Sequence, residues 1–247
     1  RNVKEANPEA IILAEHYGEA KSWLQGDQWD TVMNYDAFME PLTWFLTGME
    51  KHSDEYSEGM FGNSDCFISA MQYHMASFYA PSLMTAMNEL SNHDHSRFLT
   101  RTNHKVGRVA HMGSEAAGQE INKAIFREAV VMQMTWPGAP TIYYGDEAGL
   151  CGFTDPDNRR TYPWGREDRE LIQFHRDMIA IHKENRELIE GSLKFLANDY
   201  QLLCYGRFTD REKTVVAVNN SDQTKLVELS VWELGISRSR EAPFTQL

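Results

Sequence analysis

The sequence predicts an α/β fold in residues 1–190 and a small antiparallel β domain in residues 191–247. Four short apolar runs in the first part each end in charged or polar residues and alternate with segments of helical periodicity. Successive strand-helix units favour parallel neighbours, because parallel strands require long connections and helices supply them. After residue 190 the pattern changes to short β-prone runs separated by polar turns. Spacing alone fits either part of a (β/α) barrel or a doubly wound sheet.

The first two strands are expected at residues 9–14 and 30–35. The first is a short apolar run that ends at Glu15, and we expect it to be buried. The second is followed by two predicted helices, at residues 37–49 and 65–78. The apolar side chains that repeat with helical period in the earlier of these helices are Phe38, Leu42, Phe45, Leu46 and Met49.

The third and fourth strands are expected at residues 84–90 and 139–144. Their helices are predicted at residues 121–134 and 169–186, where apolar side chains again follow helical period. Polar residues follow both strands: Ser91, Asn92, His93 and Asp94 after the third, and Gly145, Asp146 and Glu147 after the fourth. In both cases an apolar strand is therefore followed directly by polar residues, as in the first two strands.

The antiparallel domain is predicted from four short runs separated by Asn-Asp, Asp-Arg and Asn-Ser-Asp turns. These runs lie at residues 194–196, 201–205, 214–218 and 225–229. Residues 237–247 show no pattern, so we expect the β domain to stop early.

Composition excludes some classes of partner and compartment. The net charge of −12 and the pI near 5.2 argue against nucleic acid and anionic membrane surfaces, because both would repel the chain at neutral pH. No apolar run reaches the roughly 18 residues that span a bilayer, and the start does not resemble a signal peptide. The three cysteines are far apart and are interpreted as reduced, structural thiols. We favour a cytoplasmic location.

The polar strand ends form the candidate site. Because the carboxyl ends of parallel strands meet at one edge of a sheet or barrel, we expect Glu15, His93 and Asp94 to lie close together. Taken singly, each carboxylate is more typical of a helix cap or a loop salt bridge. Two carboxylates and a histidine that lie close together are more typical of a catalytic site than of a structural role.

Other kinds of site fit less well. His93 and His95 lie two residues apart, which on a strand would place both imidazoles on one face as in some metal hydrolases. A third and a fourth ligand are not found at comparable spacing, and we expect His95 to be exposed, so no metal site is predicted. Neither a G-x-S-x-G motif for a nucleophilic serine nor a glycine-rich phosphate loop is present.

Five motifs follow one another along residues 10–190. They are Ile12-Leu-Ala-Glu15-His-Tyr17, Asp30-x-Val-Met-Asn34-Tyr35, Leu90-Ser-Asn-His93-Asp94-x-x-Arg97-Phe98, Gly138-x-Pro-Thr-Ile-Tyr-Tyr-Gly-Asp-Glu147 and Asp155-Pro-Asp-Asn-Arg159-Arg-x-x-Pro-Trp164. Their order and spacing resemble glycoside hydrolase family 13, the α-amylase family. The second and fifth motifs look most like the branch of neopullulanase, cyclomaltodextrinase and maltogenic amylase. That branch usually has a Trp near the acid, where this chain has His16 and Tyr17.

The resemblance implies a (β/α)8 TIM barrel followed by an antiparallel β domain, with the four units here as strands five to eight. It implies retaining hydrolysis of α-1,4 glucosidic bonds, with α-1,6 bonds as a further candidate, in maltooligosaccharides, cyclodextrins or similar α-glucans. Glu15 would be the general acid/base and Asp94 the carboxylate that stabilises the transition state. The residues implied to bind substrate are His93, His16, Tyr17, Asn34, Tyr35, Asp155 and Arg159. For Asp155 and Arg159, a simple loop salt bridge is an equal alternative.

The resemblance also implies what the chain lacks. The family's nucleophile is an Asp in a Gly-x-Arg-x-Asp motif, which is not found here. We therefore expect the nucleophile and the N-terminal half of the barrel to lie outside this chain, and the chain alone to be inactive. No cofactor is required, and calcium in the parent protein is compatible with the family. Open strand edges would favour a complementing N-terminal half or a homo-oligomer. A non-catalytic glycan-binding or scaffold relative of the same fold is the alternative.

Overall fold

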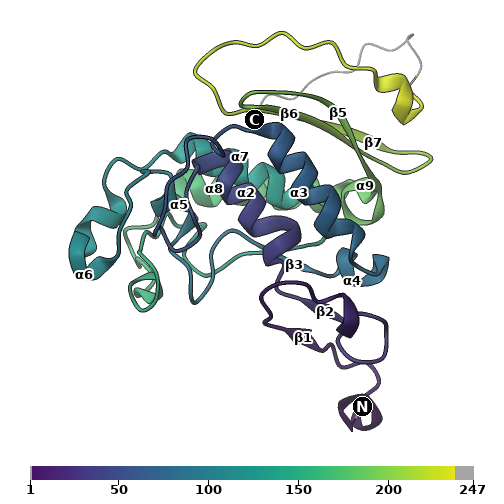
Figure 1. The fold of residues 1–247 in the computed structure, drawn as a ribbon, viewed down its shortest axis with the longest axis horizontal. Coiled ribbons are helices and arrows are strands. Elements are labelled where there is room, and N and C mark those ends of the chain that lie inside the picture. The colour runs from purple at the N-terminus through teal and green to yellow at the C-terminus, as the bar shows by residue number, and fades with distance from the viewer. Residues whose placement is uncertain (1, 237–247) are drawn as a thin grey trace.

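The computed structural model describes residues 2–236 and contains four short parallel strands in its first part (Figure 1). These are β1 (Leu13–Ala14), β2 (Thr31–Val32), β3 (Met87–Glu89) and β4 (Ala139–Thr141). β1 pairs with β2 and β3 pairs with β4, both in parallel. A parallel bridge between Met33 and Met87 joins the two pairs. The strands therefore follow one another in chain order, and the prediction of parallel neighbours is confirmed.

The first strand differs from its prediction. It contains two residues rather than six, and Ile11 and Leu13 are 76% and 41% exposed. β1 has a neighbour on one side only among the described residues, so its outer edge is open. Of its two side chains Leu13 is exposed, while Ala14 packs against the cluster of Ala20, Leu24 and Val32. The expectation of a buried strand is therefore wrong for this structure.

Helices occupy the connections between the strands and the segments after them. The α-helices are α1 (Asn2–Ala6), α2 (Glu40–Thr47), α3 (Ser64–Ala76), α4 (Ala80–Met84), α5 (Phe98–Arg101), α6 (Val109–Met112), α7 (Lys123–Thr135), α8 (Arg169–Glu184) and α9 (Arg186–Glu190). A π-helical turn over Tyr35–Met39 leads into α2. The four long helices predicted from periodicity are thus present as α2, α3, α7 and α8.

Capping residues set where these helices begin and end. The side chains of Asn63, Asn122 and Asp168 accept backbone N–H groups in the first turns of α3, α7 and α8, which satisfies donors that have no partner within the helix. Gly48 ends α2 with a φ of 65°, a conformation that favours glycine. The cap at Asn122 explains why α7 begins two residues after the predicted start at residue 121.

The last part of the described chain is a three-stranded antiparallel sheet. It contains β5 (Ser192–Asp199), β6 (Leu202–Phe208) and β7 (Lys213–Asn219), in that spatial order. The fourth predicted strand, at residues 225–229, is absent, and Leu226 is 99% exposed. The side chains of residues 225–229 alternate between partly buried and exposed, but this segment pairs with no neighbouring strand among the described residues. The prediction for residues 237–247 lies outside the described residues.

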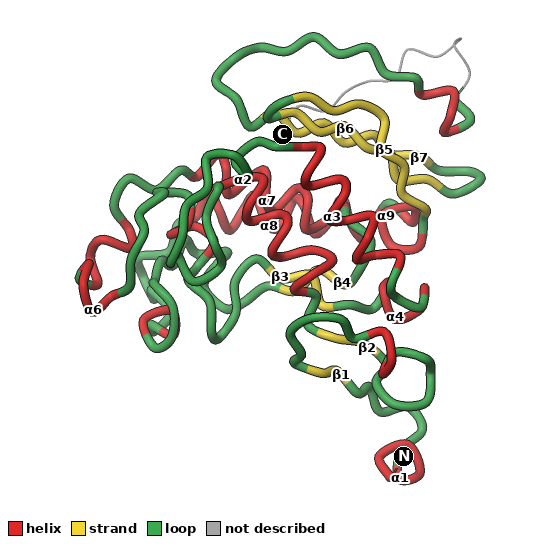
Figure 2. The backbone as a smooth tube through the Cα atoms, in the orientation of Figure 1, coloured by secondary structure: helices red, strands yellow, loops and turns green. Residues whose placement is uncertain are grey.

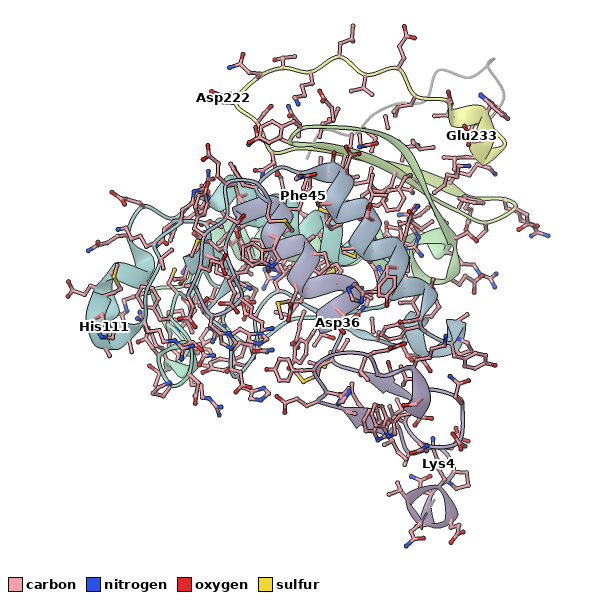
Figure 3. The ribbon with its side chains drawn as sticks, in the orientation of Figure 1. Lys4, Asp36, Phe45, His111, Asp222 and Glu233 are labelled. Carbon is pink, nitrogen blue, oxygen red and sulfur yellow. The ribbon has the colours of Figure 1, made fainter. Side chains whose placement is uncertain are left out.

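The long helices α2, α3, α7 and α8 lie between the antiparallel sheet and the short parallel strands (Figures 1 and 2). One buried apolar cluster runs through this middle layer and includes Phe45, Phe67, Trp136, Leu203 and Tyr205. Phe45, labelled in Figure 3, comes from α2, while Tyr205 comes from β6 and contacts the indole of Trp136. The change from parallel to antiparallel strands falls near residue 190, yet both parts share this core. Division into two domains stays a prediction.

Two findings bear on the expected environment. None of the helices within residues 2–236 is long and apolar enough to cross a bilayer. Cys66, Cys151 and Cys204 are unpaired, and Cys151 and Cys204 are buried.

Candidate active site

The ends of β1 and β3 bring three predicted residues together. Nε2 of His93 lies 2.9 Å from Oε1 of Glu15 and 3.7 Å from Oδ1 of Asp94. Potential ligand atoms of all three residues lie within 4.8 Å of one another. The side chains are about 40% exposed, so a molecule from solvent can reach them. We call Glu15, His93 and Asp94 the strand-end cluster.

Asn92 holds the turn that carries His93 and Asp94. Its side-chain oxygen accepts the backbone N–H groups of Asp94 and His95, both at 2.9 Å, an arrangement typical of asparagine in tight turns. Its Nδ2 donates to Oε1 of the buried Glu89 at 2.7 Å. Asn158, from the fifth motif, donates to the backbone carbonyl oxygens of Asn92 and His95. The polar turn after β3 is therefore fixed from both sides.

Arg159 connects the cluster to a second loop. Its Nε donates to the carbonyl oxygen of His93 at 3.0 Å and lies 2.5 Å from Oδ1 of Asp155. Its Nη2 lies 3.9 Å from Oδ1 of Asp94. Both Arg159 and Asp155 are about half exposed. The structure thus contains the loop salt bridge that the sequence left as an alternative, and places it beside the cluster.

Tyr17 lies against Asp94 on the other side. Its hydroxyl is 3.3 Å from Oδ2 of Asp94, and its ring stacks on Tyr35 with centroids 4.6 Å apart. Partial burial, together with the nearby charges of Asp94 and Glu15, raises the pKa of Tyr17 to about 12. The hydroxyl therefore stays protonated at neutral pH and is available as a donor.

Three other predicted binding residues are placed differently. Asn34 is fully buried, and its Nδ2 donates to Oδ1 of Asn88 at 2.7 Å. Tyr35 is also buried, beneath Tyr17. Buried side chains do not contact a saccharide in this conformation, so the expectation of direct substrate contact is corrected for both. His16 packs edge-on against Trp23 and at a tilt against Trp29, rather than within the cluster.

His95 is a residue that the sequence interpretation missed. It was expected to be exposed, but it is fully buried among aromatic rings that include Tyr35 and His52. Burial lowers the pKa of His95 to about 2, and the nearby positive charges of Arg101 and Lys51 act in the same direction. The imidazole is therefore neutral at neutral pH. Its position directly after Asp94 was the only available signal.

A buried ion pair between Arg97 and Asp146 supports the same turn. Nη1 of Arg97 lies 2.9 Å from Oδ1 of Asp146, and Cζ of its guanidinium lies 4.2 Å from the centroid of the Tyr143 ring. Its Nε donates to the carbonyl oxygen of Asn158 at 2.9 Å. The third, fourth and fifth motifs are thereby tied together by one buried arginine.

Metal binding has two geometric candidates within the described residues. One is the strand-end cluster, and the other is Glu50, His52 and Asp54. In the second group, Glu50 accepts a hydrogen bond from His52, and the Asp54 carboxylate is bound by the guanidinium of Arg108. Neither group contains His95, so the two imidazoles of the metal-hydrolase alternative do not converge. The absence of a required cofactor stays a prediction, as does calcium in the parent protein.

Glu89 gives a testable dependence of stability on pH. Burial raises the pKa of Glu89 to about 8, and the charges of Asp146 and Glu15 act in the same direction. An unfolded Glu titrates near about 4.3, so between these values the folded state holds an additional proton. Stability should fall as the pH rises through this range and level off above about 8.

We expect Glu89→Gln to flatten this slope, because Gln keeps the shape and has no proton to lose. The measurement is urea unfolding of the wild type and the variant at several values between about pH 5 and pH 8. Some slope should remain, since burial also raises the pKa of Glu128 to about 7. Equal slopes in the two proteins would contradict the assignment to Glu89.

Residues 1–219 match the model of the alpha amylase catalytic domain. The chain is 33% identical to neopullulanase 2 of Thermoactinomyces vulgaris, over 95% of this chain and 36% of that protein. It is 32% identical to a cyclomaltodextrinase of Thermoanaerobacter pseudethanolicus, over 92% of this chain and 35% of that protein. The chain thus spans about a third of the length of these curated relatives.

Solved structures show the same similarity. The debranching enzyme of Nostoc punctiforme superimposes with a TM-score of 0.79 at 30% identity, covering 94% of this chain and 45% of that one. A cyclomaltodextrinase structure superimposes with a TM-score of 0.70 at 30% identity, covering 88% of this chain and 33% of that one.

Proposed function

The chain belongs to the α-amylase family of glycoside hydrolases, and we propose that it supplies the acid/base and transition-state carboxylates of a retaining α-glucosidic hydrolase. The observation that carries the proposal is the convergence of Glu15, His93 and Asp94 from the ends of two parallel strands. Carboxylates at such a site are the groups that glycoside hydrolysis requires.

Each residue of the cluster has a distinct role in this proposal. Glu15 protonates the departing glycosidic oxygen and later removes a proton from the attacking water. Asp94 stabilises the positive charge that develops on the sugar ring, which it favours over the neutral ground state. His93 donates a hydrogen bond to a hydroxyl of the same sugar. Asp155 and Arg159 bind hydroxyls of a neighbouring sugar from the loop beside the cluster.

The nucleophile is proposed to come from residues outside this chain. A retaining reaction needs a second carboxylate that attacks the anomeric carbon, and the family motif that carries it is not found in the sequence. We assign the four parallel strands to positions five to eight of a (β/α)8 barrel. The exposed apolar edge at Ile11 and Leu13 supports this assignment, because strands of a closed barrel have neighbours on both sides.

The substrate class follows from the relatives. Their names specify neopullulanase, cyclomaltodextrinase and amylopullulanase activities. We propose that the complete protein hydrolyses α-1,4 bonds, and α-1,6 bonds where present, in maltooligosaccharides, cyclodextrins or pullulan.

The test compares the complete protein with this chain alone. We expect the complete protein to release products from maltotriose with the α configuration first, as followed by proton NMR, because a retaining reaction inverts the anomeric carbon twice. The purified 247-residue chain should show no turnover, since it cannot form the glycosyl-enzyme. Release of glucose or maltose by the chain alone, or β products from the complete protein, would refute the proposal.

A further inference from the structure

The hydroxyl of Tyr17 lies between two residues that follow β3. It is 3.3 Å from Oδ2 of Asp94 and 3.2 Å from Nε2 of His95. His95 is fully buried, whereas Tyr17 and Asp94 are partly exposed. The three groups therefore form a chain that leads from the interior to the strand-end cluster.

The contact between Tyr17 and Asp94 fixes where the tyrosine proton lies. A carboxylate only accepts hydrogen bonds, so the proton between Tyr17 and Asp94 must come from the tyrosine hydroxyl. That hydroxyl has a single proton, and it stays protonated because its pKa is raised to about 12. The contact with His95 is then a hydrogen bond only if Nε2 carries the imidazole proton and the tyrosine oxygen accepts it.

The surroundings of His95 agree with this tautomer. Its Nδ1 is buried and has no hydrogen-bond partner. A buried N–H without an acceptor is rarer in folded proteins than an unused acceptor. The proton is therefore placed on Nε2. The Tyr35 hydroxyl also lies beside the Tyr17 oxygen. If it donates to Tyr17 the result is unchanged, since a tyrosine oxygen can accept twice, and if it donates to Sδ of Met33 it does not use the Tyr17 proton.

We propose that His95 is a positioning residue, which directs the Tyr17 hydroxyl at Oδ2 of Asp94 through an Nε2–H donor. The other carboxylate oxygen, Oδ1, faces His93 and Arg159 at 3.7 and 3.9 Å. Asp94 thus has a hydroxyl donor at Oδ2 and two nitrogen-bearing side chains near Oδ1. With the carboxylate orientation fixed, no reorganisation is needed when positive charge develops on the sugar. This role in catalysis rests on the function proposed above for Asp94.

The tautomer is tested directly by NMR of the protein labelled with ¹⁵N-histidine. The long-range coupling pattern of an imidazole identifies which nitrogen is protonated, and comparison with His95→Asn assigns the His95 signals. We expect Nε2–H at neutral pH. An Nδ1–H tautomer or a charged imidazole would overturn the inference, even if the protein proved to be an active glycosidase.

Kinetics of the complete protein test the coupling between the two residues. Tyr17→Phe and His95→Asn should each lower kcat on maltotriose about tenfold with a smaller change in KM, because each removes a hydrogen bond that acts on a charged group. The double variant should also lose only about tenfold, rather than a hundredfold, because both changes break one chain. His95→Gln, whose amide can donate from the position of Nε2, should stay within about threefold of the wild type.

His104→Asn is the matched control. His104 is half-buried in an aromatic environment beside Tyr56 and has a φ of 58°, which asparagine tolerates. His104 lies outside the strand-end cluster, so His104→Asn should leave kcat unchanged. Multiplicative losses in the double variant, or a loss in His95→Gln as large as in His95→Asn, would overturn the positioning role. If the wild type shows no glycosidase activity, the proposed function fails, while the NMR result still decides the tautomer.

Discussion

Replacing Glu15 with Gln in the complete protein is expected to lower kcat on maltotriose by about a thousandfold or more. Gln has nearly the same shape, so binding should change little, but it has no proton to give to the departing sugar oxygen. Because fluoride leaves without protonation, the variant should still react with α-maltosyl fluoride. Hydrolysis of the glycosyl-enzyme would then be slow, since no base activates water. We therefore expect a burst of fluoride release equal to the enzyme concentration, followed by slow turnover.

Glu9→Gln is the control for this experiment. Glu9 is exposed, lies before the same strand and is outside the strand-end cluster. It should keep normal turnover on both substrates. Near-normal hydrolysis of maltotriose by Glu15→Gln would end the assignment of Glu15 as the acid. Another outcome for the Glu15→Gln variant is equal losses of kcat on maltotriose and on α-maltosyl fluoride, with no burst of fluoride. That result would show that Glu15 does not act by transferring a proton to the leaving group.

The convergence of the cluster could be predicted because it follows from topology alone. Parallel strands place their carboxyl ends at one edge, so Glu15 and Asp94 could be expected to meet although they lie 79 positions apart in the sequence. The main helices were predictable for a related reason, since apolar side chains repeat with helical period. Their ends were shifted by caps such as Asn122, whose side-chain hydrogen bonds outweigh the periodic pattern.

Burial and side-chain partners could not be predicted in the same way. Asn34 and Tyr35 follow β2 as Glu15 follows β1, yet they are buried, because the helix after β2 and the turn after β3 cover them. His95 points inward because Asn92 and Asn158 fix the backbone of its turn. Residues 225–229 alternate like a strand, but a strand also needs a partner with free hydrogen-bonding groups, and local sequence does not specify one. These features depend on contacts between distant segments.

Asp94→Asn tests the electrostatic part of the mechanism and is expected to lower kcat by about a hundredfold to a thousandfold. Asn keeps the size of the side chain and its contact with the Tyr17 hydroxyl but removes the negative charge. The charge matters most when the sugar ring becomes positive, so kcat should fall more than binding weakens. Because this stabilisation does not depend on the leaving group, the losses on maltotriose and on α-maltosyl fluoride should be similar, in contrast to those of Glu15→Gln.

Asp222→Asn provides the matched change of charge at a distance. Asp222 is exposed on the loop after β7 (Figure 3) and should leave both rates unchanged. A fluoride burst in Asp94→Asn like that of Glu15→Gln would contradict the separation of roles, because it would mean that Asp94 also serves the departing oxygen. A rise in KM with kcat preserved would instead reduce Asp94 to a binding group, since an interaction equal in ground and transition states does not change the chemical step.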